Sequence, residues 1–316
     1  MSTNDSSDDA GAEGGTAGTG AAAPRCGYVA FVGRPNVGKS TLLNRLVGQK
    51  VSITSSRPQT TRHTLLGIHT EGADQIIYVD TPGLHSAEKR ALNRAMNRSA
   101  RAALADVDVA CMLVEAGRWT EADDMVLGLL GQARGARFLI INKADRMVPR
   151  QRLLPFMEAC SKRAAFDEII PLSALNGENL EALTDCIRAR LPHAPHLFGD
   201  DAFTDRSERF LVAETIREKI MRRVGDELPH QITVTIEQWT QEPRVLVIHA
   251  NILVEREGQR AIVIGHGGER LKQVGIDARR DIEELLGTHV RLELWVKVRG
   301  GWSDNESMLR NLGFTE

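Results

Sequence analysis

Short apolar runs alternate with helix-length amphipathic segments over the first two thirds of the chain. The runs of strand length are Tyr28 to Val32, Ile76 to Val79, Val109 to Val114, Phe138 to Ile141 and Ile169 to Leu172. Because parallel strands need a long crossover connection, this alternation favours an α/β domain with a mostly parallel sheet.

One pair of strands departs from this alternation. Only Glu71-Gly72-Ala73 separates the run Thr64 to Thr70 from the run Asp74 to Asp80. So short a connection suits an antiparallel hairpin, and we therefore expect one edge of the sheet to run antiparallel.

A stretch rich in proline and glycine, at Leu191 to Pro195 and Gly199 to Asp201, then interrupts the pattern and predicts a linker. Beyond it the order of elements changes to a helix, two β-rich runs, a glycine-rich turn, a long helix and a final strand. These elements are expected at Ser207 to Val224, Gln231 to Trp239, Arg244 to Val254, Glu269 to Leu286 and His289 to Val298. The order indicates a second domain of the α+β class.

The chain therefore divides into four parts. Residues 1–24 are built mainly from Gly, Ala, Ser, Thr, Asp and Glu, with no apolar segment of the kind a secretory signal needs, and we predict a disordered acidic tail. Residues 25–192 form the α/β domain, 193–205 the linker, and 206–316 the α+β domain with a C-terminal extension.

Charge and composition restrict the class of protein. Lys and Arg total 40 against 42 Asp and Glu, so any site for a polyanion must be local. The four cysteines form no Cys-x-x-Cys pair, which indicates reduced thiols and a cytosolic setting. No apolar run reaches the roughly 18 residues of a membrane-spanning helix. His193 and His196 lie among prolines with no third ligand nearby, which favours a linker over a metal site.

Gly33 to Ser40 fits the phosphate-binding pattern G-x-x-x-x-G-K-[ST]. It follows an apolar strand and precedes an expected helix, so backbone amides at the helix N-terminus can surround phosphates while Lys39 supplies a positive charge. Ser40 is a candidate Mg²⁺ ligand. The pattern alone does not separate ATP from GTP.

Asp80-Thr81-Pro82-Gly83 follows the second hairpin strand. At this position Asp80 can hold Mg²⁺ through water, and the Gly83 amide can respond to the γ-phosphate. Thr61, in the polar segment Gln59 to His63, is the candidate for a second Mg²⁺ hydroxyl.

Asn142-Lys143-Ala144-Asp145 comes at the end of a predicted strand and identifies the base. Asp145 can accept two hydrogen bonds from guanine, whereas adenine would leave its carboxylate desolvated and unpaired. Asn142 is expected to brace the pocket and Lys143 to cover one face of the ring. In Ser173-Ala174-Leu175, a backbone amide, that of Ala174, is expected to reach the guanine O6.

Two residues bear on the rate of hydrolysis. Leu84 stands where many such switches carry a glutamine that positions the attacking water, so slow intrinsic hydrolysis is expected. Asn36 either ligates a monovalent cation such as K⁺ near the phosphates or only shapes the loop, and the sequence leaves both readings open.

The predicted nucleotide site is thus a defined set of residues. Its binding residues are Gly33, Arg34, Pro35, Asn36, Val37, Gly38, Lys39, Ser40, Thr41, Asp80, Thr81, Pro82, Gly83, Leu84, Asn142, Lys143, Asp145, Ser173, Ala174 and Leu175. The candidate catalytic residues are Lys39, Thr61, Asp80, Gly83 and Asn36, and the candidate Mg²⁺ ligands are Ser40, Thr61 and Asp80.

The second domain contains G-x-x-G at Gly265 to Gly268, before a predicted helix. KH domains use this arrangement to clamp single-stranded RNA, which makes RNA contacts at Ile264, Gly265, His266, Gly267, Gly268, Arg270 and Lys272 the favoured interpretation. A solvated basic helix face is the alternative.

Taken in order, these motifs closely resemble those of the bacterial Era GTPases, over about residues 27 to 314. The matching segments are Gly33 to Thr41, Gln59 to His63, Asp80 to His85, Arg118-Trp119-Thr120, Asn142 to Asp145, Leu253 to Gln259, Leu292 to Val298 and Gly301-Trp302. The resemblance implies a Ras-like GTPase domain followed by a type II KH domain. Members of that family also lack the catalytic glutamine, in keeping with Leu84.

The resemblance also implies two partners, 16S ribosomal RNA near its 3′ end and the 30S subunit, whose maturation the protein assists. It further implies that the protein is cytoplasmic and associates peripherally with the inner face of the cell membrane. We expect a monomer. Two other functions stay open, namely an RNA-binding assembly factor in which nucleotide is mainly structural, and a GTPase acting on protein or membrane partners in cell-cycle control.

Overall fold

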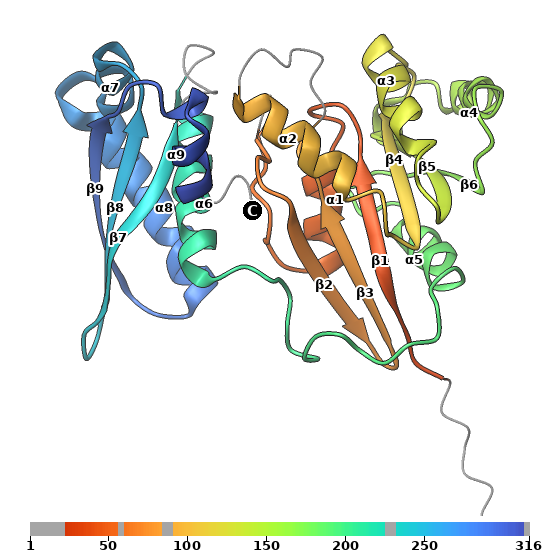
Figure 1. Ribbon diagram of the computed structural model, residues 1–316, viewed down its shortest axis with the longest axis horizontal. Coiled ribbons are helices and arrows are strands. Elements are labelled where there is room, and N and C mark those ends of the chain that lie inside the picture. Colours follow the sequence, from red (N-terminus) through yellow and green to blue (C-terminus); the bar gives the residue numbers. More distant parts are fainter. Residues whose placement is uncertain (1–22, 56–59, 84–90, 225–231, 313–316) are drawn as a thin grey trace, which may run out of the picture.

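A computed structural model describes residues 23–55, 60–83, 91–224 and 232–312. Most of the predicted tail, residues 1–22, lies outside these ranges, as do Gln59 and Leu84. The described residues form two domains, each built on its own sheet (Figure 1).

The first domain contains a six-stranded sheet with the order β2-β3-β1-β4-β5-β6. The strands are β1 Arg25–Val32, β2 Leu65–Glu71, β3 Asp74–Asp80, β4 Val109–Glu115, β5 Ala136–Asn142 and β6 Glu168–Pro171. β2 pairs antiparallel with β3, and all other neighbours are parallel. The sheet is therefore mostly parallel with one antiparallel edge, as the sequence predicted.

Helices cover both faces of this sheet, which explains why β1 and β4 are nearly continuous apolar runs. One face packs against α1 (Lys39–Val47) and α5 (Leu180–Arg188). The other packs against α2 (Ala91–Ala102), α3 (Glu121–Leu130) and α4 (Leu153–Ser161). The loops after β1, β3 and β5 all leave the sheet at its carboxyl edge, where ligands of such folds bind.

The segment predicted as a linker lies along the free edge of β2. The Ile68 amide donates to the Phe203 carbonyl at 3.0 Å, and Thr204 Oγ1 donates to the Leu66 carbonyl at 2.7 Å. His196 is bonded to Asp200 and to the Ala73 carbonyl, and the described residues contain no cluster of three or more His, Cys, Asp or Glu that could hold a metal. The segment thus covers an edge strand that would otherwise present unpaired backbone groups.

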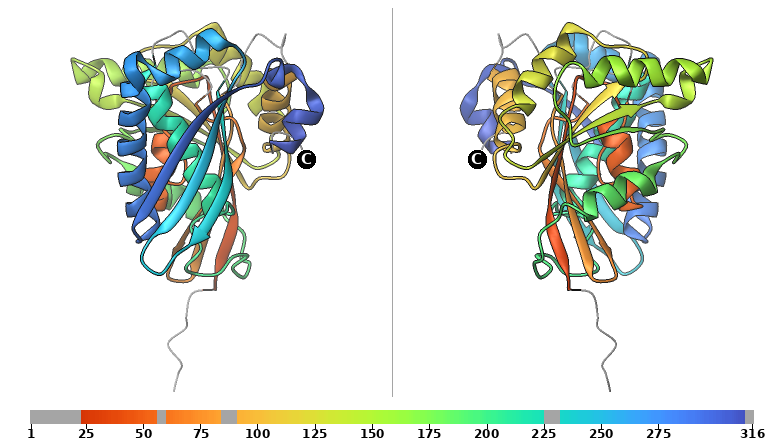
Figure 2. Two further views of the ribbon diagram at one scale, coloured as in Figure 1. Left: turned by 90° about the vertical axis from the view of Figure 1, so that its left-hand side faces the viewer. Right: turned by 90° about the vertical axis from the view of Figure 1, so that its right-hand side faces the viewer.

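The second domain contains a three-stranded sheet with the order β7-β8-β9. β7 is Thr233–Gln241, β8 is Leu246–Val254 and β9 is Val290–Val298; β7 and β8 are antiparallel, and β8 and β9 are parallel. The helices α6 (Glu208–Arg223), α7 (Glu257–Ile264) and α8 (Glu269–Leu286) pack on one face. The left view of Figure 2 looks onto the three strands.

Helix α7 corrects one expectation from the sequence, which predicted only a glycine-rich turn between β8 and α8. The Gln259 side chain accepts hydrogen bonds from the Glu255 and Arg256 amides at 2.8 and 3.1 Å, so the two amides just before this short helix are satisfied from within its first turn. Val263 is buried in the core of the second domain. The apolar run before Gly265 is therefore the inner face of a helix.

The two domains are in contact through the C-terminal extension. A 3₁₀ turn at Trp302–Asp304 and helix α9 (Glu306–Asn311) follow β9. Trp302 and Leu309 share an apolar cluster with Leu92 and Met96 of α2, and Trp302 is fully buried. The end of the second domain thus packs on a helix of the first. Within the described residues, no helix combines the length and apolar content needed to cross a membrane.

Candidate guanine-nucleotide site and RNA-facing loop

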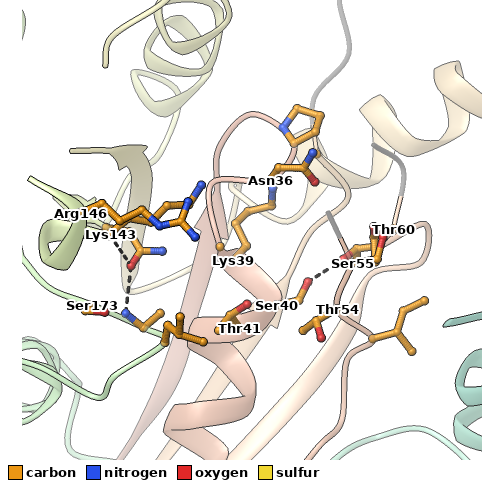
Figure 3. Close-up of a pocket in the computed structure, with 18 of the residues that line it drawn as sticks. Asn36, Lys39, Ser40, Thr41, Thr54, Ser55, Thr60, Lys143, Arg146 and Ser173 are labelled. Carbon is orange, nitrogen blue, oxygen red and sulfur yellow. Dashed lines mark hydrogen bonds between the residues drawn. The ribbon is translucent and has the colours of Figure 1, made fainter. Parts of the chain in front are cut away.

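A cavity of about 300 Å³ opens at the carboxyl edge of the first sheet. It is lined by most of the predicted nucleotide residues: Pro35, Asn36, Gly38, Lys39, Ser40, Thr41, Gly83, Asn142, Lys143, Asp145, Ser173, Ala174 and Leu175. Gly33, Arg34, Val37, Asp80, Thr81 and Pro82 do not line the cavity, and Leu84 is outside the described residues. Figure 3 shows Lys39, Ser40, Lys143 and Ser173 around the cavity.

Glycine is required at position 38 by geometry. Gly38 has φ of +105°, and a Cβ built there would lie 2.2 Å from Nδ2 of Asn142. Asn142 Nδ2 donates to the Val37 carbonyl at 2.7 Å. The phosphate-binding loop and the base-recognition loop are thus in direct contact, and this contact leaves no room for a side chain at residue 38.

Lys39 points back over the phosphate-binding loop. Its Nζ donates to the carbonyl oxygens of Gly33 at 2.9 Å and Arg34 at 3.2 Å. Burial lowers the pKa of Lys39 to about 8, although nearby Asp80 acts in the opposite direction. A buried ammonium whose hydrogen bonds within the described chain go to carbonyl oxygens is well placed to exchange them for phosphate oxygens.

Ser40, Thr61 and Asp80, the three predicted metal ligands, lie together. Ser40 Oγ is 2.7 Å from Thr61 Oγ1, and Ser40 Oγ donates to Asp80 Oδ2 at 2.9 Å. Burial raises the pKa of Asp80, and hydrogen bonds from hydroxyl groups oppose that rise. Asp80 Oδ1 is buried and has no hydrogen-bond partner within the described chain. Two hydroxyls beside a carboxylate with an unused oxygen fit a Mg²⁺ ion and its water.

Asn142 and Asp145 line the part of the cavity where the sequence predicts the base. Asn142 Oδ1 accepts hydrogen bonds from the Lys143 amide at 2.7 Å and the Ala174 amide at 3.0 Å. Asn142 therefore connects the phosphate loop, its own loop and the loop after β6. Asp145 Oδ1 is buried, and no described residue donates to it. A buried acceptor of this kind suits the N–H donors of guanine.

Sequence reasoning missed several residues of this site. Ser52 is buried and its Oγ donates to Asp80 Oδ2 at 2.8 Å. Asn44 of α1 holds the start of the same segment, accepting from the Val51 and Ser52 amides at 3.0 and 2.9 Å. Neither residue belongs to a spaced motif; only their position shortly after the phosphate loop could have indicated them. Ile53, Thr54, Ser55, Thr60 and Arg146 also line the cavity without having been predicted.

The segment that carries Thr61 is docked on the second domain. Arg62 is 2% exposed, and its Nη1 donates to the Ile232 carbonyl at 2.6 Å. His63 meets the ring of Phe210 in α6 edge-on, with ring centroids 5.3 Å apart. Arg217 of α6 donates to the Thr60 carbonyl. Burial, with neighbouring Arg217, lowers the pKa of Arg62 to about 9.

Glu218 forms a second link between this region and α6. Its side chain is fully buried. Its Oε1 accepts from the Thr54 amide at 2.9 Å, and its Oε2 accepts from Lys50 Nζ. Thr54 lines the nucleotide cavity. A carboxylate of the second domain therefore holds two residues, Lys50 and Thr54, of the segment between α1 and Thr61.

The G-x-x-G segment lies between α7 and α8. Gly265 has φ of +73°, and a Cβ there would lie 2.6 Å from the Cβ of Arg270, so the turn needs glycine at this position. Gly268 and Lys272 line an open groove with Leu271, Gly275, Ile276, Arg279, Leu292 and Leu294. Ile264, Gly265, His266 and Gly267 do not line it. Arg270 Nη1 donates to the Ile262 carbonyl, so this guanidinium also supports the turn.

Comparisons with known proteins assign both domains. Residues 28–143 match the family model of the 50S ribosome-binding GTPases, and residues 227–303 match that of the KH domain. GTPase Era of Pseudomonas aeruginosa PAO1 is 56% identical over 293 residues, 93% of this chain and 96% of its own length. GTPase Era of Azotobacter vinelandii is 55% identical over 292 residues, 92% of this chain and 97% of its own.

The chain belongs to the Era family of GTPases.

Solved Era structures agree over both domains. Era in complex with MgGDPNP and nucleotides 1506–1542 of 16S ribosomal RNA is similar with a TM-score of 0.90 and 38% identity, covering 93% of this chain and 100% of that one. An Aquifex aeolicus Era variant bound to GDP and AlF₄⁻ has a TM-score of 0.89 and 39% identity, covering 92% and 100%. The predicted fold class and the resemblance to Era are confirmed, and the chain is a GTPase.

Proposed function

We propose that this Era-family GTPase is a GTP-controlled switch that binds 16S ribosomal RNA near its 3′ end and assists maturation of the 30S subunit. The observation that carries the proposal is the double attachment of residues Thr60 to His63. Thr61 lies in the Asp80 cluster, while Arg62 and His63 contact the second domain. A change at the γ-phosphate therefore has a direct physical route to the KH domain.

The proposal gives the main motif residues the following roles, although the Ala174 amide, expected at the guanine O6, donates to Asn142 Oδ1 in this structure. Lys39 holds the β- and γ-phosphates, the Gly83 amide responds to the γ-phosphate, and Asp145 pairs with guanine while Asn142 fixes the loops around it. Ser40, Thr61 and Asp80 would hold Mg²⁺, which neutralises charge on the β- and γ-phosphate oxygens when bound. The relatives solved with MgGDPNP and with GDP support GTP, GDP and Mg²⁺ as ligands.

Hydrolysis by the isolated chain is expected to be slow. Leu84 cannot orient water by hydrogen bonding, so the glutamine that many such switches use for this purpose is missing here. Asn36 lines the cavity with φ of +64°, a position compatible with a K⁺ ligand beside the phosphates. Stimulation by K⁺ therefore stays a prediction of the proposal.

We propose 16S ribosomal RNA as the partner because the relative solved with it is similar to this chain over both domains. The family model named for the 50S subunit matches residues 28–143, whereas the Era solved with a 16S fragment is similar over 93% of this chain. In the KH domain the groove beside Gly268 is bordered by Lys272 and Arg279, a cationic edge suited to an RNA backbone.

We retain 25–192, 193–205 and 206–316 as the domain boundaries, supported by the two separate sheets. A cytoplasmic, monomeric protein is likewise part of the proposal. Peripheral contact with the cell membrane is a prediction that follows from the resemblance to Era.

Crosslinking to ribosomal RNA in 30S precursors, with GDP or a non-hydrolysable GTP analogue, tests the proposal. We expect crosslinks from the Gly265 to Lys272 segment to nucleotides near the 3′ end of 16S RNA, stronger with the analogue. Changing His266 and Gly267 together to Asp should remove them, because the added charge repels phosphate and Asp tolerates the positive φ at residue 267.

The two alternative functions predict different results. A protein in which nucleotide is only structural would give equal crosslinks in both nucleotide states. A GTPase that acts on protein or membrane partners would give no crosslinks near the 16S 3′ end and would keep its partner after the double Asp substitution.

A further inference from the structure

Glu115 lies between two loops of the nucleotide site, although none of the nucleotide motifs includes it. It is the last residue of β4, which lies between β1 and β5 in the sheet (Figure 1). The register pairs Glu115 with Asn142 of the base-recognition loop. Sheet order alone therefore places this carboxylate between the end of β1, where the phosphate loop begins, and the end of β5.

The two oxygens of Glu115 are shared between those loops. Oε2 accepts from Nη2 of Arg34, in the phosphate loop, at 3.0 Å. Oε1 accepts from Nζ of Lys143, in the base loop, at 3.1 Å. The side chains of Arg34, Glu115 and Lys143 are 12%, 22% and 22% exposed, so solvent screens these contacts less than it screens an ordinary surface ion pair.

The surroundings hold Glu115 in place. Its carbonyl accepts from the Arg118 amide at 3.0 Å, and the next amide, of Ala116, donates to the Asn142 carbonyl at 2.8 Å. Burial alone would raise the pKa of Glu115, but the hydrogen bonds from Arg34 and Lys143 outweigh it and the pKa is lowered. The carboxylate is therefore ionised at neutral pH and can hold both cations.

Arg34 has a second carboxylate partner that directs it away from the nucleotide. Its Nε is 3.2 Å from Oδ1 of Asp123, a fully buried residue of α3. With its side chain held on both carboxylates, the Arg34 carbonyl is fixed where it accepts from Lys39. Without Glu115, Arg34 and Lys143 would be two neighbouring cations with no common anion.

We propose that Glu115 is a positioning residue for guanine-nucleotide binding, which holds the Lys143 side chain over the base and the phosphate loop under the phosphates at the same time. This inference rests on the proposed roles of Lys143 and Lys39 and is independent of RNA. Because Glu115 contacts neither the γ-phosphate position nor the Asp80 cluster, it acts on GDP and GTP alike and on binding in preference to hydrolysis.

The test measures dissociation of fluorescent GDP and of a fluorescent non-hydrolysable GTP analogue from the full chain without RNA, together with KM and kcat for GTP. Glu115→Ala should speed dissociation of both nucleotides by a similar factor, about 5- to 30-fold, with a matching rise in KM and less than about twofold change in kcat. Glu115→Gln keeps one acceptor oxygen and should recover part of the loss.

Glu158→Gln is the matched control, since it breaks an exposed ion pair with Lys162 on α4 and should leave every constant unchanged. Native dissociation rates in Glu115→Ala would overturn the inference, as would a fall in kcat at unchanged KM or an effect on the GTP analogue alone. A native protein that bound no guanine nucleotide would instead overturn the proposed site itself.

Discussion

We propose that the Asp145 carboxylate determines which base is bound. Its buried Oδ1 has no donor within the described chain. Asp145→Asn replaces an acceptor by a donor that would face the N–H groups of guanine, so GTP affinity should fall by about 100-fold or more. Xanthine has a carbonyl in place of the exocyclic amine, and XTP should bind the variant better than GTP does.

Competition of GTP and XTP for a fluorescent nucleotide measures this preference. Asp124→Asn is the control, because Asp124 pairs with Arg163 on the exposed outer side of α3. If Asp145→Asn kept the native order of GTP over XTP, another residue would be reading the base.

Ser52 stabilises the charged form of Asp80. Its hydroxyl donates to Asp80 Oδ2 at 2.8 Å, and burial already raises the pKa of that carboxyl. Ser52→Ala removes a hydrogen bond to the anion, so the Mg²⁺ concentration for half-maximal GTPase activity should rise about three- to tenfold. Titration of Mg²⁺ at saturating GTP measures this half-maximal concentration.

Ser161→Ala is the control for that titration, because Ser161 is exposed at the end of α4, and its Mg²⁺ requirement should be native. An unchanged Mg²⁺ requirement in Ser52→Ala would mean that the hydroxyls of Ser40 and Thr61 suffice to hold Asp80.

At the scale of elements, the contact between the C-terminal extension and α2 joins the domains by apolar packing. Trp302 is fully buried against Leu92 and Met96. Trp302→Ala should cost about 3–5 kcal/mol of unfolding free energy, as large-to-small changes in a core do. It should also raise hydrogen exchange of the α2 amides, because α2 loses the surface that covers it.

Trp295→Ala is the matched control, since Trp295 is 43% exposed on β9. Hydrogen exchange that rose in α9 but stayed at its native rate in α2 would show that α2 does not depend on this contact.

The sequence predicted the elements whose pattern is strong and local. The parallel strands, the hairpin at Glu71 to Ala73 and the long helix α8 were all expected. Helix α7 was missed because its eight residues contain Gly258 and end in an apolar run that also suits a strand. The segment 193–205 was correctly seen as irregular, but its hydrogen bonds to β2 depend on a strand edge that composition does not reveal.

The same limit applies to the site. Motif residues such as Lys39, Asp80 and Asp145 could be assigned because their spacing is set by the chemistry of the nucleotide. Ser52, Glu115 and Glu218 belong to no motif, and each is brought to the site by strand order or by the contact between domains. Long-range geometry of this kind is absent from a single sequence.

For the whole molecule, the central claim is that nucleotide state controls RNA binding through the contact of α6 with the loop that follows α1. Glu218 is the buried carboxylate of that contact, bonded to Thr54 and Lys50. Glu218→Gln keeps the side-chain shape but removes the buried charge that Lys50 and Arg222 contact, and it leaves Lys50 only its second partner, Asp281. The variant should lose nucleotide dependence of RNA affinity while keeping nucleotide binding, and the exposed Glu208→Gln on the same helix should behave as native.

The most direct measurement is the dissociation constant for an RNA containing the 3′ end of 16S ribosomal RNA, at one fixed salt concentration, with a non-hydrolysable GTP analogue and with GDP. The account predicts about tenfold or greater tighter binding with the analogue, a coupling free energy of about 1.4 kcal/mol, and a ratio near one in Glu218→Gln. Equal dissociation constants for the native protein in the two nucleotide states would contradict it.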